Sequence, residues 1–301
     1  MNAICVSMPG SAKFAVQLAK ALAASHASLD IHRFPDAETR IRLESDCSGK
    51  NVVIVDNGRD PNGNALPLYF ATHAAKAMGA SSVGLVTPYL PYMRQDAQFR
   101  EGEAVSALAY ARYLSGCVDW IATVDPHLHR IQALEEIFAI PAVCATSMPS
   151  ISRWIGANVI RPIIIGPDSE SGQWVKPVAT ALDVPWATLK KQRTGDRQVA
   201  VSLPEAGILD GRSPVIVDDI ASSGRTLAEA AMALRSLGSL PVTCVVVHAL
   251  LDVAAESELR AAGVAQLIST NTIEHSSNGI DIVPALAQQV RTVLQGTTGN
   301  A

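Results

Sequence analysis

The sequence has few residues of the kinds that mark extracellular, zinc-binding or nucleic-acid-binding proteins. Only five of its 301 residues are cysteines, and no two of them form a Cys-x-x-Cys pair. A disulfide framework and a zinc site are therefore not indicated, and reduced thiols in a cytoplasm fit best. Charged residues make up 17%, the formal net charge is −4, and no long Lys/Arg run occurs. We therefore expect a small-molecule partner rather than a nucleic acid or an anionic membrane.

Signals for membrane insertion and export are also lacking. No apolar run approaches the length of a membrane span, and the N-terminus has no basic region followed by an apolar core and a cleavage site. We expect a soluble, unprocessed, cytoplasmic protein. Low-complexity stretches are absent as well, so nearly all of the chain should belong to folded units.

Hydrophobic residues, in contrast, make up 48% of the chain, enough for two cores of modest size. Short apolar runs alternate with helical patterns, which predicts an α/β fold with parallel sheets. Prolines interrupt the pattern near residues 144–150. We expect one domain at residues 1–145, completed by a helix at 282–297, and a second at 146–281. The expected strands lie at 3–6, 52–55, 83–86, 120–124, 163–165, 215–217 and 242–247.

The most informative segment spans residues 215–227. An apolar strand is followed by Asp218 and Asp219, then by a small polar turn, then by a helical pattern. The free backbone N–H groups of such a turn can bind a phosphate, and acids at a strand end can accept hydrogen bonds from ribose hydroxyls. An ordinary strand–turn–helix is the alternative interpretation, and we favour the phosphate site. The turn residues of this candidate phosphate site are Ser222, Ser223, Gly224, Arg225 and Thr226.

This segment resembles the motif that binds 5-phosphoribosyl-1-diphosphate (PRPP) in the phosphoribosyltransferase fold. Residues 51–58 are weakly similar to 214–219, which suggests two related units, although only the second has the phosphate-binding turn. The resemblance implies two tandem phosphoribosyltransferase-like, Rossmann-like domains with mostly parallel sheets. It leaves two functions open: a phosphoribosyltransferase, which uses PRPP, or a ribose-phosphate diphosphokinase (PRPP synthetase), which makes it.

Two segments of the first half resemble ATP-binding segments of PRPP synthetases. Residues 33–38 resemble Arg-Phe-x-Asp-Gly-Glu, with Ala37 in place of the glycine, and residues 88–96 resemble a Pro- and Tyr-rich segment ending in Arg-Gln-Asp. In the family, the first segment reaches the ATP of a neighbouring subunit. The resemblance implies that ATP is bound by Phe34, Asp36, Glu38, Arg94, Gln95 and Asp96.

Two further strand ends resemble the family's metal-binding segments. Asp125-Pro126-His127 is similar to Asp-Leu-His, whose histidine meets the metal–triphosphate, and residues 163–172 are similar to a strand followed by Pro-Asp-x-Gly. The resemblance implies that His127 contacts ATP and, with Asp168, lies near Mg²⁺, which uses few protein ligands. A lone histidine is more often structural, and we assign His129 to that class.

A basic segment at residues 190–197 decides between making and using PRPP. It resembles the Lys-x-Arg that begins a mobile catalytic loop in PRPP synthetases, which implies catalytic roles for Lys191 and Arg193. Two cations spaced i, i+2 on an extended segment point the same way, so both could reach one phosphate cluster. For an isolated segment, a solvated basic turn would be the better interpretation.

The resemblance covers nearly the whole chain and implies a ribose-phosphate diphosphokinase. Its substrates would be ATP and ribose 5-phosphate, its cofactor Mg²⁺, and its active form a homo-oligomer, either a dimer or a hexamer. A phosphoribosyltransferase remains an alternative, although it leaves the motifs of the first half without a role. A non-catalytic regulatory paralogue is a third possibility, against which the joint presence of the four catalytic and metal-site residues speaks.

Overall fold

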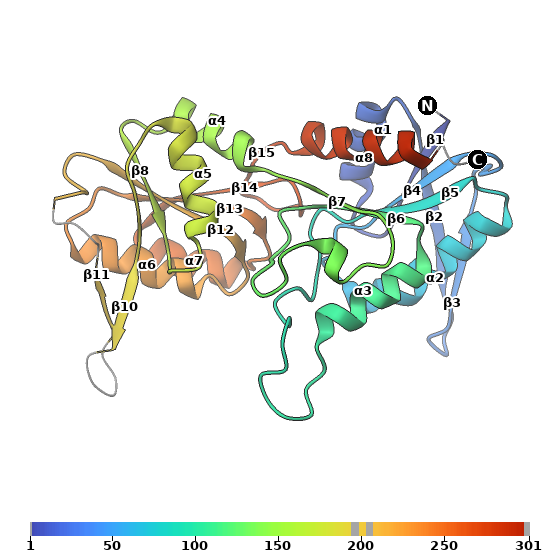
Figure 1. The fold of residues 1–301 in the computed structure, drawn as a ribbon, viewed down its shortest axis with the longest axis horizontal. Coiled ribbons are helices and arrows are strands. Elements are labelled where there is room, and N and C mark those ends of the chain that lie inside the picture. The colour runs from blue at the N-terminus through green and yellow to red at the C-terminus, as the bar shows by residue number, and fades with distance from the viewer. Residues whose placement is uncertain (1, 194–198, 203–206, 298–301) are drawn as a thin grey trace. The chain divides into compact units, whose positions relative to one another are not determined.

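The structure is a computed structural model that describes residues 2–193, 199–202 and 207–297, with the backbone alone for 190–193, 199–202 and 297. The chain divides into two compact units. The first consists of Met1–Thr146 and Val283–Ala301, and the second of Ser147–Ile282. Figure 1 shows both units along the colour gradient.

The first unit contains a seven-stranded sheet in the order β3-β2-β1-β4-β5-β6-β7. All neighbouring strands run parallel except β2 and β3, which form an antiparallel hairpin at the edge. Four of the strands are buried along their whole length, as expected for strands that are covered on both faces. The strands are β1 (Ala3–Ser7), β2 (Ser25–Arg33), β3 (Thr39–Leu43), β4 (Asn51–Val55), β5 (Ser82–Val86), β6 (Trp120–Val124) and β7 (Ala142–Ala145).

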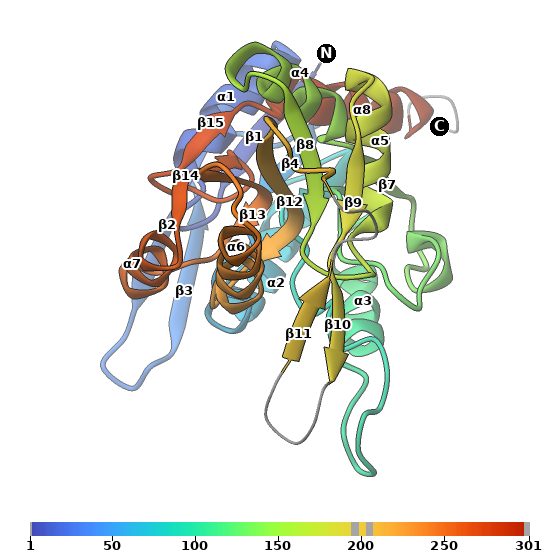
Figure 2. The ribbon, with the colours of Figure 1, turned by 90° about the vertical axis from the view of Figure 1, so that its left-hand side faces the viewer.

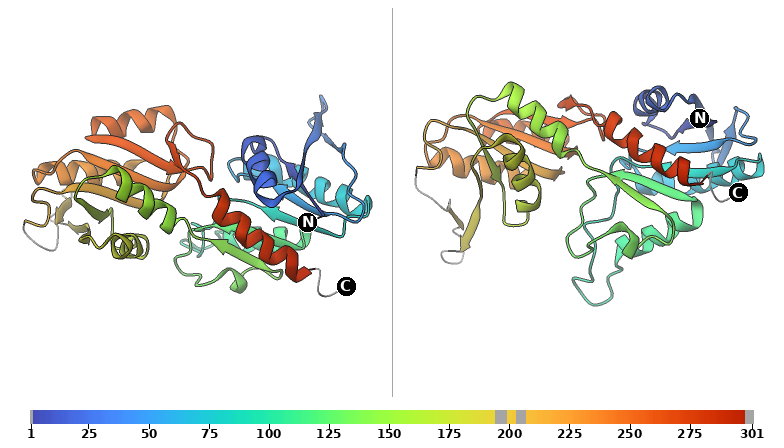
Figure 3. Two further views of the ribbon diagram at one scale, coloured as in Figure 1. Left: turned by 90° about the horizontal axis from the view of Figure 1, so that it is seen from above. Right: turned by 45° about the horizontal axis from the view of Figure 1, so that its top comes forward.

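Two helices cover each face of this sheet. On one face, α8 packs against α1 and lies along β6 and β7, so the last helix of the chain completes the first unit (Figure 3). On the other face, α2 packs against α3. Gly84 makes room for the fully buried indole of Trp120, because a Cβ at Gly84 would lie 1.9 Å from the ring. The helices are α1 (Ala12–Leu22), α2 (Pro61–Ala77), α3 (Ser106–Cys117), the 3-10 helix η1 (Leu134–Glu136) and α8 (Val283–Thr297).

The second unit contains a six-stranded, fully parallel sheet in the order β15-β14-β13-β12-β8-β9. Figure 2 shows this sheet with α6 and α7 on one side and α4 and α5 on the other. The strands are β8 (Pro162–Gly166), β9 (Trp186–Thr188), β12 (Ser213–Ala221), β13 (Val242–Ala249), β14 (Val264–Thr270) and β15 (Asn278–Ile280). The helices are α4 (Met148–Asn158), α5 (Gly172–Leu182), α6 (Arg225–Ser236) and α7 (Val253–Ala261).

A separate two-stranded antiparallel ribbon follows β9. It pairs β10 (Lys190–Arg193) with β11 (Val199–Ser202). The backbone therefore places the basic segment singled out in the sequence on an extended strand, outside the main sheet.

Each of the seven strands expected from the sequence is present, and β12 is the one whose bounds differ most from the expectation. The apolar run predicted a strand at residues 215–217, with Asp218 and Asp219 at its carboxyl end. The strand instead continues to Ala221, because its parallel pairing with β13 extends through Asp218↔Val246 to Ala221↔Ala249. Asp218 and Asp219 are therefore the sixth and seventh of the nine residues of β12, and the turn begins at Ser222.

Candidate active site

The turn between β12 and α6 provides an open helix N-terminus. Gly224 is the N-cap of α6 with φ +71°, a conformation that glycine adopts without strain, and a Cβ there would lie 3.1 Å from Leu251. The first N–H groups of a helix have no partner within the helix, and the first turn of α6 carries no acidic residue. The N–H of Arg225 lies 3.4 Å from Oγ of Ser223, and no carboxylate of the described residues caps the helix, so the positive end of its dipole is available to an anion.

The corresponding helix of the first unit is closed by its own carboxylate. Asp60 is the N-cap of α2 and accepts a hydrogen bond of 3.0 Å from the N–H of Gly63. The negative charge of Asp60 already occupies the place where a phosphate would bind. This difference supports the interpretation that only the second unit has kept the phosphate-binding turn.

The two acids of β12 lie in different surroundings. Asp219 is buried, and its Oδ1 accepts a hydrogen bond of 2.8 Å from the N–H of Ile220. Asp218 is half-buried, and its Oδ1 accepts one of 3.1 Å from the N–H of Asp219. Neighbouring residues of a strand point to opposite faces of the sheet. Asp218 and Cys244 lie on the same face of the sheet. The pKa of the Cys244 thiol is raised by burial and, further, by the Asp218 carboxylate.

The loop between β8 and α5 leaves half of a carboxylate available. Oδ1 of Asp168 accepts hydrogen bonds of 3.0 Å from the N–H groups of Glu170 and Ser171, which fixes the carboxylate in the loop. Its Oδ2 accepts no hydrogen bond from the part of the chain that the structure describes. A single oriented carboxylate oxygen of this kind suits a Mg²⁺ ion that takes most of its ligands from water and phosphate.

The segment with Phe34, Asp36 and Glu38 forms the tip of the β2–β3 hairpin. The N–H of Phe34 donates to the carbonyl of Glu38 at 2.8 Å, and Ala37 has φ +71°. Oδ1 of Asp36 accepts from the N–H of Glu38 at 3.1 Å. The ring of Phe34 is 40% exposed and meets His32 edge-on at 4.6 Å. An aromatic face is thus held at an exposed turn.

The loop after β5 carries Arg94, Gln95 and Asp96. Arg94 is exposed, and Nε2 of Gln95 lies 3.4 Å from Oε2 of Glu103. The carboxylate of Asp96 is 2% exposed and lies 2.8 Å from Nη1 of Arg130, so its oxygens are occupied by a protein cation. Asp96 therefore differs from Arg94 and Gln95, whose side chains remain accessible.

His127 follows a bend in the backbone at the end of β6. Asp125 is buried, its N–H donates to the carbonyl of Ala145 at 3.1 Å, and its φ of +34° is unusual for a residue with a side chain. His127 itself is half-buried. Positive φ values also occur at Ala37 and Tyr92. Each of the three candidate segments of the first unit thus contains one strained backbone position, a feature that is common at functional sites.

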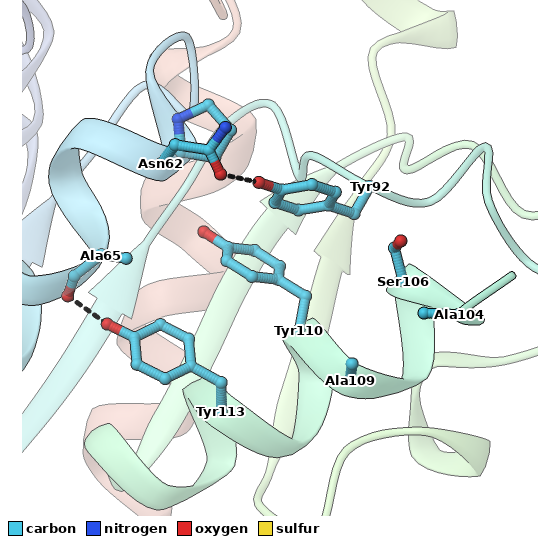
Figure 4. A pocket seen from close by; sticks show the side chains of 9 residues that line it. Asn62, Ala65, Tyr92, Ala104, Ser106, Ala109, Tyr110 and Tyr113 are labelled. Carbon is cyan, nitrogen blue, oxygen red and sulfur yellow. Dashed lines mark hydrogen bonds between the residues drawn. The ribbon is translucent and has the colours of Figure 1, made fainter.

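A pocket in the first unit lies beside the loop of Arg94, and sequence reasoning missed it. Its volume is about 340 Å³, and three tyrosine rings form one wall (Figure 4). The ring centroids of Tyr92 and Tyr110 lie 4.8 Å apart, and those of Tyr110 and Tyr113 lie 5.9 Å apart. The hydroxyl of Tyr92 donates to Asn62 at the start of α2. The spacing of Tyr110 and Tyr113 on a helix was the only sequence signal for this wall.

The catalytic candidates Lys191 and Arg193 lie on β10, opposite Val201 and Val199. Their side chains lie outside the described residues. Apart from the hairpin residues, the other candidates lie at or just after the carboxyl ends of strands β5, β6, β8 and β12. Ligands of open α/β sheets bind at these strand ends.

Two features are absent from the residues that the structure describes. No group of three or more His, Cys, Asp or Glu side chains in them could hold a metal ion. Over the same residues, every helix is too short or too polar to cross a membrane.

Comparison with known proteins gives matches over nearly the whole chain. The family model of the N-terminal domain of ribose phosphate pyrophosphokinase matches residues 3–117, and that of the phosphoribosyl transferase domain matches residues 133–288. The ribose-phosphate pyrophosphokinase of Methanopyrus kandleri is 31% identical over 93% of this chain and 96% of its own length. That of Methanothermobacter thermautotrophicus is 30% identical over 95% and 99%.

Among solved structures, phosphoribosylpyrophosphate synthetase from Mycobacterium smegmatis matches with a TM-score of 0.86 at 24% identity. The match covers 98% of this chain and 100% of the other. The predicted fold, two phosphoribosyltransferase-like α/β domains with mostly parallel sheets, is confirmed. The prediction of an enzyme of the ribose-phosphate diphosphokinase type is confirmed by the named relatives. The chain belongs to the ribose-phosphate pyrophosphokinase family.

Proposed function

We propose that the protein transfers the β,γ-diphosphoryl group of ATP to the 1-hydroxyl of ribose 5-phosphate, which gives PRPP and AMP. The observation that carries this proposal is the open N-terminus of α6 next to the acids of β12. It supplies a phosphate site and a sugar site in one continuous segment. A phosphoribosyltransferase would need the same segment, but it would leave the candidate ATP residues of the first unit without a role.

The second unit is the proposed ribose 5-phosphate side. The 5-phosphate binds to the N–H groups and hydroxyls of the turn, and Thr226 is half-buried in the first turn of α6. Asp218 is the better placed of the two acids to accept a hydrogen bond from a sugar hydroxyl, because it is half-buried whereas Asp219 is buried. The turn residues in this role are Ser222, Ser223, Gly224, Arg225 and Thr226.

The first unit is the proposed ATP side. The exposed ring of Phe34 offers a π face to the adenine, and Asp36 and Glu38 offer acceptors for its amino group. Arg94 and Gln95 are accessible on their loop and contact the nucleotide. Asp96 belongs to the same site, and its contact with Arg130 supports a role in holding the loop rather than in touching ATP.

Magnesium is the proposed cofactor: His127 of the first unit and the Oδ2 of Asp168 of the second are each a candidate ligand, and phosphate oxygens and water would complete the coordination. The absence of a cluster of three ligand side chains among the described residues suits this ion, which uses few protein ligands. When bound, Mg²⁺ would neutralise charge on the phosphates. Lys191 and Arg193 are proposed to direct their positive charges at the transferring group, since such a reaction depends on positioning and electrostatic stabilisation.

The active form is proposed to be a homo-oligomer, a dimer or a hexamer. The support is the position of Phe34, Asp36 and Glu38 at the exposed tip of an edge hairpin, where they could reach a neighbouring copy. The proposed location of the protein is the cytoplasm, which suits the free cysteines among the described residues.

The product nucleotide tests the proposed reaction. The purified protein with ATP, ribose 5-phosphate and Mg²⁺ should release AMP, and removal of the divalent cation with a chelator should stop the release. ADP as the main product would indicate an ordinary kinase. Consumption of added PRPP in the presence of a purine or pyrimidine base, without AMP release from ATP, would indicate a phosphoribosyltransferase.

A further inference from the structure

The loop that carries Arg94 and Gln95 is anchored on both sides of these residues. On the N-terminal side, the hydroxyl of Tyr92 donates to Oδ1 of Asn62 (Figure 4). On the C-terminal side, Asp96 binds Arg130, which follows β6. Two accessible side chains are thus held on a short segment between two fixed points.

The contact between Asp96 and Arg130 joins a nearly buried carboxylate to an arginine whose side chain is 51% exposed. Nη1 of Arg130 lies 2.8 Å from Oδ1 of Asp96, and the N–H of Arg130 donates to Oδ2 at 3.0 Å. Both carboxylate oxygens are therefore used, and the Asp96 side chain is 2% exposed. One bond comes from the guanidinium and is charge-assisted, the other comes from the backbone, and together they fix the carboxylate in direction as well as distance.

Arg130 also contacts the loop beyond Asp96. Its guanidinium lies 5.3 Å from the ring centre of Phe99, within the range of a cation–π contact. Glu103 holds the same stretch, because its Oε2 accepts from the N–H groups of Phe99 and Arg100 at 3.2 and 3.1 Å. One arginine thus joins the loop after β5 to the loop after β6, the loop that carries His127.

We propose that Arg130 is a positioning residue for ATP: it holds the loop of Arg94 and Gln95 in register with the His127 loop. The proposal rests on the proposed ATP roles of Arg94, Gln95 and His127. Arg130 itself needs no contact with the nucleotide. Its effect on ATP would pass through Asp96 and the loop backbone.

The test compares Arg130→Gln and Arg130→Lys with a matched control, Lys76→Met. Lys76 forms an ion pair of 2.9 Å with Asp119 in the same unit, on elements that carry none of the proposed site residues. For each protein, the dissociation constant for MgATP is measured by calorimetry without ribose 5-phosphate. Trypsin cleavage after the exposed Arg94 and Arg100 reports on the order of the loop, and thermal unfolding reports on global stability.

We expect Arg130→Gln to weaken MgATP binding about tenfold or more and to accelerate cleavage within the loop. Arg130→Lys should lie between Arg130→Gln and the parent, because it keeps the charge but has only one donor group. Lys76→Met should leave both readouts at the parent values, whatever its thermal stability. Combining Asp96→Asn with Arg130→Gln should weaken binding no further than the stronger single variant, since both remove the same contact.

Two results would overturn the proposal. One is loop cleavage at the parent rate in Arg130→Gln, because the arginine would then not hold the loop. The other is accelerated cleavage with unchanged ATP binding, because the loop's position would then not matter for the nucleotide. A parent protein that binds no MgATP would instead contradict the proposed function, which is a separate outcome from either of these.

Discussion

At the scale of single residues, Asp56 shows what burial does to an acid at a strand end. Its side chain is buried directly after β4, where desolvation raises the pKa from 3.8 to about 6. Hydrogen bonds from the N–H of Gly58 and from Asn64 oppose this rise, and the charge of Asp60 adds to it. The folded protein therefore retains a proton that the unfolded chain loses at lower pH.

This difference predicts a pH-dependent stability that Asp56→Asn removes. Between about pH 4 and pH 6 the folded state binds more protons than the unfolded state, so the free energy of unfolding of the parent falls as the pH rises. Asparagine keeps the acceptor oxygen without the charge. The free energy of unfolding of Asp56→Asn, minus that of the parent, should therefore be up to about 3 kcal/mol larger at pH 7 than at pH 4. Urea unfolding of both proteins at pH 4 and pH 7 measures this difference. The same difference between variant and parent at both pH values would contradict the prediction.

A second prediction at this scale concerns Lys191, whose catalytic role is proposed. Lys191→Ala should lower kcat about a hundredfold or more, the scale of losing one oriented charge donor in the transition state, with little change in substrate binding. Lys176→Ala, an exposed lysine on α5, serves as the control and should retain parent activity. An unchanged kcat with a raised KM would contradict the catalytic role and indicate that the basic segment only binds substrate.

Residue types could be predicted from the sequence, whereas their contacts could not. The Arg-Gln-Asp motif marked three residues as equivalent, but the fold buries one of them against Arg130. That arginine stands 34 positions away from Asp96, and no local pattern marks it. The pocket beside this loop likewise needs α2, α3 and the loop after β5 to come together.

At the scale of secondary-structure elements, the hairpin of β2 and β3 carries a backbone cost. Ala37 has φ +71°, a conformation that costs an alanine roughly 1–2 kcal/mol relative to the right-handed region. Glycine avoids this cost, although it loses more entropy on folding. We expect Ala37→Gly to raise the free energy of unfolding by about 0.5–1 kcal/mol.

The control for this prediction is an alanine in ordinary helical backbone. Ala109 is exposed in the interior of α3, where Ala109→Gly should lower the free energy of unfolding by about 1 kcal/mol. Urea unfolding of the two variants should thus give changes of opposite sign. A decrease in both would mean that the turn is not strained at Ala37.

Element types followed from hydrophobic periodicity, because strands covered on both faces read as continuous apolar runs. The end of β12 did not follow, because Asp218 and Asp219 interrupt the apolar run while the ladder with β13 continues past them. The β2–β3 hairpin around residues 33–38 was also missed, because none of the strands expected from the sequence lies there. Its turn depends on Ala37 in a conformation that alanine rarely adopts.

At the scale of the whole molecule, the proposed oligomer can be tested by mixing variants. If Phe34 of one copy completes the ATP site of another, a Phe34→Ala protein and a Lys191→Ala protein should together form some complete sites. Random exchange in a dimer would restore up to about a quarter of the parent sites. Activity is measured after the two proteins have been mixed and allowed to exchange subunits.

The matched mixture combines Lys191→Ala with Arg193→Ala. Both changes fall on the same strand of the same unit, so no hybrid site is complete and activity should stay low. Equal activity in the two mixtures, or full activity of a monomer, would contradict a shared site.

In the proposed reaction, the diphosphoryl group passes intact from ATP to ribose 5-phosphate. The most direct measurement uses ATP labelled at the β-phosphorus, together with ribose 5-phosphate and Mg²⁺, and follows the label by chromatography. The label should appear in PRPP in the same amount as unlabelled AMP is formed. Label retained in ADP, with only the γ-phosphate transferred, would contradict it.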